Sequence, residues 1–224
     1  MKLLALTAAT GAALLTPLAA SADSASVTQT SPFISITGGK SHFNVDRDVS
    51  GTTFSGSEDR NSTGITVLGG YRWVVARPFA LGVEAGYAHL GSTTWKARDG
   101  GLSEPYDVRD KNKVDAFLAG INGKWDLPYD LTITAHAGLA HVRSKGDFTG
   151  SSGGTSTPAS TTRVHHDWSG NRFYGGVGFG YDYDENMGLT LSYDRYSFKA
   201  DGPRDTGHNA QIGVLGLTAE YRFY

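Results

Sequence analysis

The sequence contains no cysteine, and its charge is nearly balanced, with 20 lysines and arginines against 22 aspartates and glutamates. The absence of cysteine excludes thiol catalysis, a disulfide framework and a lipid-modified cysteine anchor. A net charge of -2 gives no electrostatic reason to expect nucleic acid as a partner, so we expect no nucleic-acid binding.

Long apolar runs are also scarce. The one such stretch, residues 3–18, follows an N-terminal lysine and precedes Ala20-Ser21-Ala22, an A-x-A cleavage pattern. We therefore expect residues 1–22 to be a signal peptide, with Ala20 and Ala22 as its cleavage signal, and residues 23–224 to form one domain. No later run approaches the roughly 20 apolar residues of a membrane helix, so only strands would carry this exported chain across a bilayer.

Glycine and tyrosine are abundant, with 30 and 11 residues, and this composition favours strands and turns over helices. Segments of period-two alternation, which is typical of strands, recur along the chain. They cover residues 33–43, 63–73, 79–90, 114–125, 131–143, 172–183, 187–198 and 211–223. The sequence therefore predicts eight strands and no internal domain boundary.

Short and long connections alternate between these segments. The short ones, residues 74–78, 126–130 and 184–186, contain proline, aspartate or asparagine and predict tight turns. The long ones, residues 44–62, 91–113, 144–171 and 199–210, are rich in small and charged residues and predict loops. In an up-and-down barrel this alternation places every turn at one rim and every loop at the other, as in outer membrane barrels.

The phase of the alternation indicates which face meets lipid. In segment 79–90 one face carries Phe79, Leu81, Val83, Ala85 and Tyr87, and the other carries Gly82, Glu84 and Gly86. A closed eight-stranded lumen has little room for bulky aromatic side chains, which excludes an inward apolar face as in a soluble barrel. An outward apolar face gives a lipid-facing band with aromatic girdles. We predict an all-β fold, an eight-stranded antiparallel up-and-down transmembrane β-barrel in a bacterial outer membrane.

The last segment ends in aromatic residues that keep the lipid-facing phase. Tyr221 and Phe223 are in phase with Leu215 and Leu217, whereas Tyr224 is not. We interpret Tyr221 and Phe223 as the assembly signal that the barrel assembly machinery would recognise.

These segments resemble the transmembrane domain of outer membrane protein A and the related opacity-type surface barrels. The matching pieces are Gly69-Gly70-Tyr71, Gly82-Val83-Glu84-Ala85-Gly86-Tyr87, Phe173-Tyr174-Gly175-Gly176-Val177, Leu191-Ser192-Tyr193 and Tyr221-Arg222-Phe223. The resemblance implies a charged network inside the barrel, with Glu84, Lys124, His136 and Arg222 at the matching inward positions. Gly178 and Thr190 stand where the family can place an acid and a base, so the network is expected to be reduced on that side.

The inward phase also contains Arg72 and Glu220. The predicted polar network of the lumen is therefore Arg72, Glu84, Lys124, His136, Glu220 and Arg222. Charges inside a narrow barrel must be paired because unpaired burial costs several kcal/mol or more, so we interpret the network as structural. An ion-conducting lumen is the alternative. His136 has no identifiable serine or carboxylate partner and is interpreted as lumen filling.

Other polar motifs carry weaker signals. His165-His166 lies beside Asp167 in a long connection, but adjacent histidines of an extended segment point in opposite directions and rarely bind one metal ion. We interpret that connection as a solvated loop. Asp182, Asp184 and Asn186 echo a calcium loop but lack its glutamate. We predict no catalytic, cofactor-binding or metal-ligating residue.

The leading hypothesis is a structural and surface-interaction protein, not an enzyme. A rigid barrel would display loops for adhesion or envelope integrity, with outer membrane lipid, lipopolysaccharide and a host or surface ligand as partners. One alternative is a narrow porin-like channel for ions or small solutes. Another is a membrane-embedded lipid hydrolase, although the sequence offers no convincing trio of serine, histidine and carboxylate near the outer rim.

Overall fold

The computed structural model describes residues 28–44, 55–99, 106–154, 157–200 and 208–224. The expected signal peptide, with Ala20 and Ala22, lies outside these residues and stays a prediction. Within the described ranges, no helix has the length and hydrophobicity needed to cross a bilayer.

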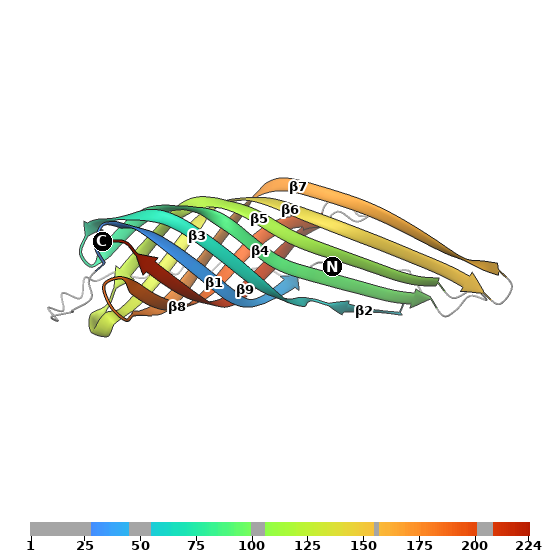
Figure 1. The fold of residues 1–224 in the computed structure, drawn as a ribbon, viewed down its shortest axis with the longest axis horizontal. Helices are drawn as coiled ribbons and strands as arrows, with labels where there is room; N and C mark the ends of the chain where they lie inside the picture. Colours follow the sequence, from blue (N-terminus) through green and yellow to red (C-terminus); the bar gives the residue numbers. More distant parts are fainter. Residues whose placement is uncertain (1–27, 45–54, 100–105, 155–156, 201–207) are drawn as a thin grey trace, which may run out of the picture.

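The described chain forms a closed antiparallel barrel (Figure 1). Its strands are β1 (Ser31–Asn44), β3 (Asn61–Ala76), β4 (Phe79–Asp99), β5 (Tyr106–Asp126), β6 (Leu131–Gly154), β7 (Thr157–Asp182), β8 (Met187–Ala200) and β9 (His208–Arg222). Each pairs with the next along the chain, and β1 pairs with β9 to close the ring. A short strand β2 (Ser55–Asp59) pairs only with the far end of β4. The predicted eight-stranded barrel is confirmed.

Tight turns gather at one rim, at the left of Figure 1, together with the C-terminus. The β5–β6 turn is a 3-10 helix, η1 (Pro128–Asp130), in which Tyr129 and Asp130 adopt positive φ. In the β7–β8 turn, the Asp184 carboxylate accepts hydrogen bonds from the backbone N–H groups of Asn186 and Met187, at 2.8 and 2.6 Å. The predicted short connections are therefore confirmed as turns.

Two of the predicted long loops are mostly strand, which corrects that expectation. β4 and β5 stay paired out to Asp99 and Tyr106, and β6 and β7 stay paired out to Gly154 and Thr157. These strands project beyond the ring, at the right of Figure 1. The outward residues of this part are polar, which indicates that it lies outside the lipid. The apolar alternation that marks a membrane strand is lost there, while backbone pairing continues.

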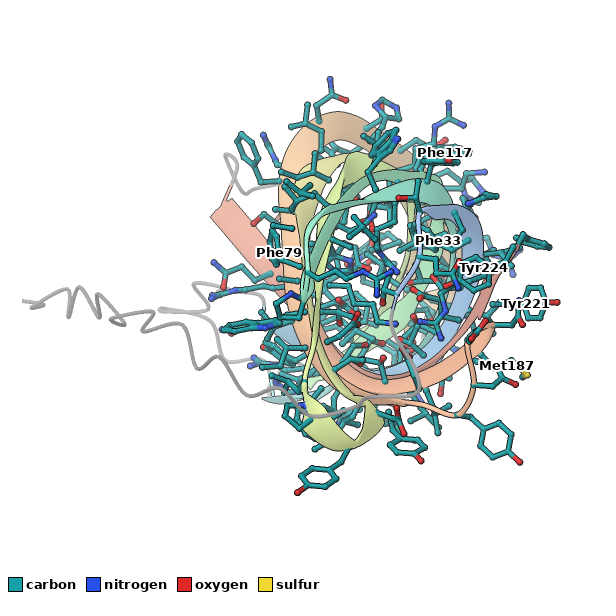
Figure 2. The ribbon with its side chains drawn as sticks, turned by 90° about the vertical axis from the view of Figure 1, so that its left-hand side faces the viewer. Phe33, Phe79, Phe117, Met187, Tyr221 and Tyr224 are labelled. Carbon is teal, nitrogen blue, oxygen red and sulfur yellow. The ribbon has the colours of Figure 1, made fainter. Side chains whose placement is uncertain are left out.

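The outward face of the ring is apolar, as predicted. Large apolar side chains point away from the barrel along every strand, and Ile121 and Phe173 are 64% and 76% exposed. Figure 2 shows Phe79, Phe117 and Tyr221 outside the ring. Tyr87 of β4 and Phe117 of β5 are cross-strand neighbours whose rings lie 5.3 Å apart, edge to face. Such exposure of apolar surface fits lipid contact and forms the expected girdle.

The lumen has two halves. The half next to the turns contains the charged residues. The other half contains an apolar cluster that includes Phe43, Leu90, Val114, Val142 and Ile212. The alternation within the predicted strands did not predict this apolar half of the lumen.

The apolar half of the lumen begins where the outward face becomes polar. The inversion is seen in pairs of consecutive residues, of which one is outward and polar and the other is inward and apolar. These pairs are His42 and Phe43, His89 and Leu90, Asp115 and Val114, His141 and Val142, Arg195 and Tyr196, and Gln211 and Ile212. Outside the bilayer the barrel meets water, so apolar side chains move inside, as in a soluble β-protein. We use this inversion to locate the outer boundary of the lipid band.

The closed ring predicts resistance to detergent. Folded protein should migrate differently from boiled protein on a dodecyl sulfate gel, because a closed barrel has no free edge within the membrane from which unfolding can start. Identical mobility before and after boiling would contradict the closed fold.

The position of Phe223 predicts a second, directional effect. The Phe223 ring lies edge to face with Tyr221 at 4.9 Å, and its N–H donates to the Pro32 carbonyl. A lysine costs up to about 2–4 kcal/mol on the lipid face at the midplane and less near the rim. Phe223→Lys should therefore lower the folded yield in vesicles more than Tyr224→Lys, measured by the gel shift. Equal yields would show that the lipid-facing phase is misassigned.

Candidate functional site

A cluster of five charges lies in the lumen near the turns. It contains Arg72 of β3, Lys124 of β5, Asp182 of β7, and Glu220 and Arg222 of β9. Arg72 donates two hydrogen bonds to Glu220, at 2.9 and 3.1 Å. Lys124 and Arg222 both donate to Asp182, at distances of 2.7–2.9 Å. Lys124 also lies 3.9 Å from Glu220, so the cluster forms one connected network.

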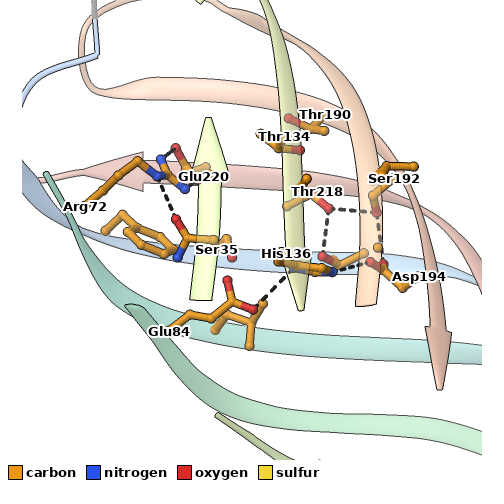
Figure 3. A pocket seen from close by; sticks show the side chains of 18 residues that line it. Ser35, Arg72, Glu84, Thr134, His136, Thr190, Ser192, Asp194, Thr218 and Glu220 are labelled. Atoms are coloured by element: carbon orange, nitrogen blue, oxygen red, sulfur yellow. Dashed lines mark hydrogen bonds and ion pairs between the residues drawn. The ribbon is translucent and has the colours of Figure 1, made fainter. Parts of the chain in front are cut away.

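A second cluster lies deeper in the lumen, around His136 of β6 (Figure 3). The imidazole Nε2 lies 2.7 Å from Asp194 Oδ1, and Nδ1 lies 3.3 Å from Glu84 Oε1. The Tyr174 hydroxyl donates to the same Glu84 oxygen at 2.7 Å, and the Ser192 hydroxyl donates to Asp194 at 3.2 Å. The expectation that His136 lacks a carboxylate partner is therefore wrong, because two carboxylates flank its ring.

The two clusters together balance their charge. Both nitrogens of His136 face carboxylates, and the imidazolium is the form of the ring that can donate to both. With His136 counted as imidazolium, the lumen holds four cations, Arg72, Lys124, His136 and Arg222, against four anions, Glu84, Asp182, Asp194 and Glu220. Such complete pairing is what burial in a narrow barrel requires.

Glycines create the space for these groups. A Cβ added at Gly176 would lie 2.0 Å from Asp194 Oδ1 and 2.6 Å from His136 Nε2. A Cβ at Gly120 would lie 2.6 Å from the Tyr174 hydroxyl. The inward glycines are therefore the complement of the large polar side chains opposite them.

All six predicted network residues point into the lumen. Asp182 and Asp194 also belong to the network, but they were not predicted. The network is not reduced on the β7–β8 side, because these two aspartates supply its acids, four residues beyond Gly178 and Thr190. Both share the inward phase of their strands, and that phase was the available signal. The partial calcium motif does not converge on an ion, because Asp182 enters the lumen while Asp184 caps the turn.

The predicted loop around His165 is part of β7. His165 Nδ1 bonds the carboxylate of Asp147 on β6, and the side chains of His165, Asp167 and Ser169 are exposed, as expected of a solvated segment. Among the residues that the structure describes, no three histidine or acidic side chains are placed to hold a metal ion.

A cavity of about 60 Å³ separates the two clusters. Arg72, Asn122 and Glu220 line one side, and His136, Asp194 and Leu68 line the other. A cavity of this size and polarity holds a few water molecules. The apolar cluster fills the lumen beyond it.

Asp182 supports two cations, so its loss should be the most damaging single change in the network. Asp182→Asn should lower the free energy of unfolding by about 3–5 kcal/mol, because Lys124 and Arg222 would stay buried without their carboxylate. Glu185→Gln removes an exposed acid from the adjacent turn and should change the free energy of unfolding by less than about 0.5 kcal/mol. Urea unfolding in lipid vesicles measures both. Equal effects would mean that the network contributes no stability.

The comparisons with solved structures concern small outer membrane barrels. The attachment invasion locus protein Ail of Yersinia pestis has 16% identity and a TM-score of 0.46, with 88% of this chain and 100% of that chain covered. Neisserial surface protein A has 14% identity and a TM-score of 0.42, covering 85% and 97%. The outer membrane protein OprG of Pseudomonas aeruginosa has 12% identity and a TM-score of 0.42, covering 90% and 100%. No curated protein sequence matches the chain.

Family membership follows from the sequence match. Residues 10–223 match the outer membrane protein beta-barrel domain, which covers nearly the whole chain. The resemblance drawn from the strand motifs is thereby confirmed. This chain belongs to the outer membrane β-barrel protein family and resides in the bacterial outer membrane.

Proposed function

We propose that the protein is a surface-interaction protein, in which a filled barrel anchors a β-sheet outside the cell. The observation that carries this proposal is the extension of β4, β5, β6 and β7 past the boundary of the lipid band. We call this part the outer sheet: residues 92–99, 106–113, 144–154 and 157–171. Paired strands present side chains in fixed positions, so the surface is more rigid than four separate loops would be.

The outer sheet has a free edge among the described residues. β7 pairs with β8 only from Tyr174 to Asp182, whereas β8 continues with β9 out to Ala200. Residues 157–173 of β7 therefore pair with β6 alone. An unpaired edge offers N–H and C=O groups to an extended segment of another protein, which supports a role in adhesion.

The filling of the lumen supports display over conduction. A channel needs a continuous water path, but the charges near the turns bond one another and the other half contains packed apolar side chains. The polar groups also do not form a hydrolytic site. The Ser192 hydroxyl donates to Asp194 and not to His136, so it lacks the adjacent base that activates a nucleophile. We therefore propose a role without enzymatic activity.

The proposal predicts that the distal β6–β7 hairpin is needed for binding but not for folding. Asp147 and His165 are directly opposed, so Asn-Gly in place of residues 148–164 closes the strands with a two-residue turn in register. This variant should keep the gel shift and lose most adhesion of displaying cells to cultured host cells and to one another.

The matched lumen variant is Glu84→Gln, which leaves the outer sheet intact. Neither the native protein nor Glu84→Gln should pass a sizeable current across a planar bilayer, and Glu84→Gln should retain adhesion. A sizeable native current that changes in Glu84→Gln, together with adhesion that survives the hairpin replacement, would favour the narrow channel instead.

A further inference from the structure

The chain reaches β1 by crossing the mouth of the lumen at the turn-side rim, the end that faces the viewer in Figure 2. Residues 28–30 precede β1, yet Thr28 is bonded to Asp126 at the end of β5. Around the closed ring, β3 and β4 separate β1 from β5 on one side, and four strands separate them on the other. Residues 28–30 therefore form a chord across part of the mouth.

Both polar groups of Thr28 bind one carboxylate. Its backbone N–H donates to Asp126 Oδ2 at 2.8 Å, and its hydroxyl donates to Oδ1 at 2.7 Å. Asp126 follows Asn122 and Lys124 in the inward phase of β5, so this carboxylate faces the lumen. Thr28 is only 2% exposed, although residues outside the strands normally stay at the surface unless they are tied down.

Two further hydrogen bonds hold the residues that follow Thr28. The Thr30 hydroxyl accepts from the backbone N–H of Val74 at the end of β3, at 3.1 Å. The Gln29 N–H donates to the hydroxyl of Tyr224, which follows β9, at 3.3 Å. Gln29 and Thr30 are themselves exposed, so one side of this segment meets water. We call residues 28–30 the latch.

The latch lies over buried groups at the charged end of the lumen. Thr132 of β6 is directly opposed to Asp126 and is 2% exposed. Lys124 and Arg222, which share the carboxylate of Asp182, are 2% and 1% exposed. Water entering at this end would raise the effective dielectric constant around these ion pairs and weaken them. The charged half of the lumen therefore needs a cover on the turn side.

We propose that the latch closes the turn-side mouth, with Asp126 as its anchor, and that its release admits water and small ions to the charged half of the lumen. Residues 28–30 belong to no strand and carry no large apolar side chain, so release breaks hydrogen bonds without unfolding the sheet. The bonds to Asp126 dominate, because a hydrogen bond to a charged group shifts an equilibrium by about tenfold or more. This device depends on the barrel and not on the proposed surface role.

The test measures how often the mouth is open. The native chain has no cysteine, so one introduced thiol is the only reactive one. Thr132→Cys places it beneath the latch, and Ser169→Cys places it on the exposed outer sheet. A small methanethiosulfonate reagent, followed by mass spectrometry, should label Thr132→Cys far more slowly than Ser169→Cys. When opening and closing are fast, the labelling rate is proportional to the open fraction.

The decisive variant is Thr28→Val, which removes the hydroxyl and preserves the shape of the side chain. It should raise the labelling rate of Thr132→Cys about tenfold, whereas Thr161→Val, at an exposed threonine of the outer sheet, should leave it unchanged. In an Asp126→Ala background, Thr28→Val should add less than about twofold, because the partner of the hydroxyl is already absent. The current across a planar bilayer should stay small throughout, since the apolar cluster still fills the other half.

Three results would overturn the latch. Labelling of Thr132→Cys as fast as that of Ser169→Cys would show an open mouth. No effect of Thr28→Val, or an equal effect with and without Asp126, would show that Asp126 is not the anchor. A sizeable current in Asp126→Ala alone would support the latch and contradict the filled lumen on which the proposed function rests. The gel shift checks folding. If Thr132→Cys does not fold, deuterium exchange at the N–H of residue 28 replaces it, and exchange no faster in Thr28→Val would equally refute the latch.

Discussion

The structure depends on one constraint, that a chain inside a bilayer must satisfy every backbone polar group and turn apolar side chains outward. Ring closure by β1 and β9 meets the first demand. The second demand fixes the phase of each strand, and it ends where the lipid ends. The pairs His89 and Leu90, and His141 and Val142, mark that level, because each exchanges the polar and apolar faces between neighbouring residues. Apolar side chains therefore face outward on the lipid side of this level and inward on the other side.

Within the lipid band the polar face must be satisfied inside a narrow space. The charges achieve this by pairing across the barrel, as Arg72 on β3 does with Glu220 on β9. Each pair needs room, which glycines such as Gly176 supply on the neighbouring strand. The network therefore depends on these glycines, because a larger residue in place of a glycine would separate an ion pair. This mutual dependence makes the lumen a structural core more readily than a passage.

The sequence predicts the membrane part of the fold well, because lipid selects a strict alternation in every strand. It misses the strand extensions, where inward Thr93 and Gly146 and outward lysines give no apolar period. Phase alone also predicts that Glu84 and Arg222 face inward. It does not predict the partners of His136, because Asp194 lies 58 residues away and the register decides which side chains meet. Asp182 was hidden for a different reason, since an acid beside a turn fits a turn residue equally well.

The same constraint explains why the outer sheet differs from the barrel that carries it. Beyond the boundary, water satisfies exposed backbone groups. The outer edge of β7 can therefore stay unpaired over residues 157–173. Water also tolerates unpaired cations, so Lys113 and Lys145 can remain opposed without an acid between them. Neither feature would be stable a few residues lower, inside hydrocarbon. The features available to partners are therefore confined to the part of the molecule that the membrane does not constrain, while the charges inside the membrane pair with one another.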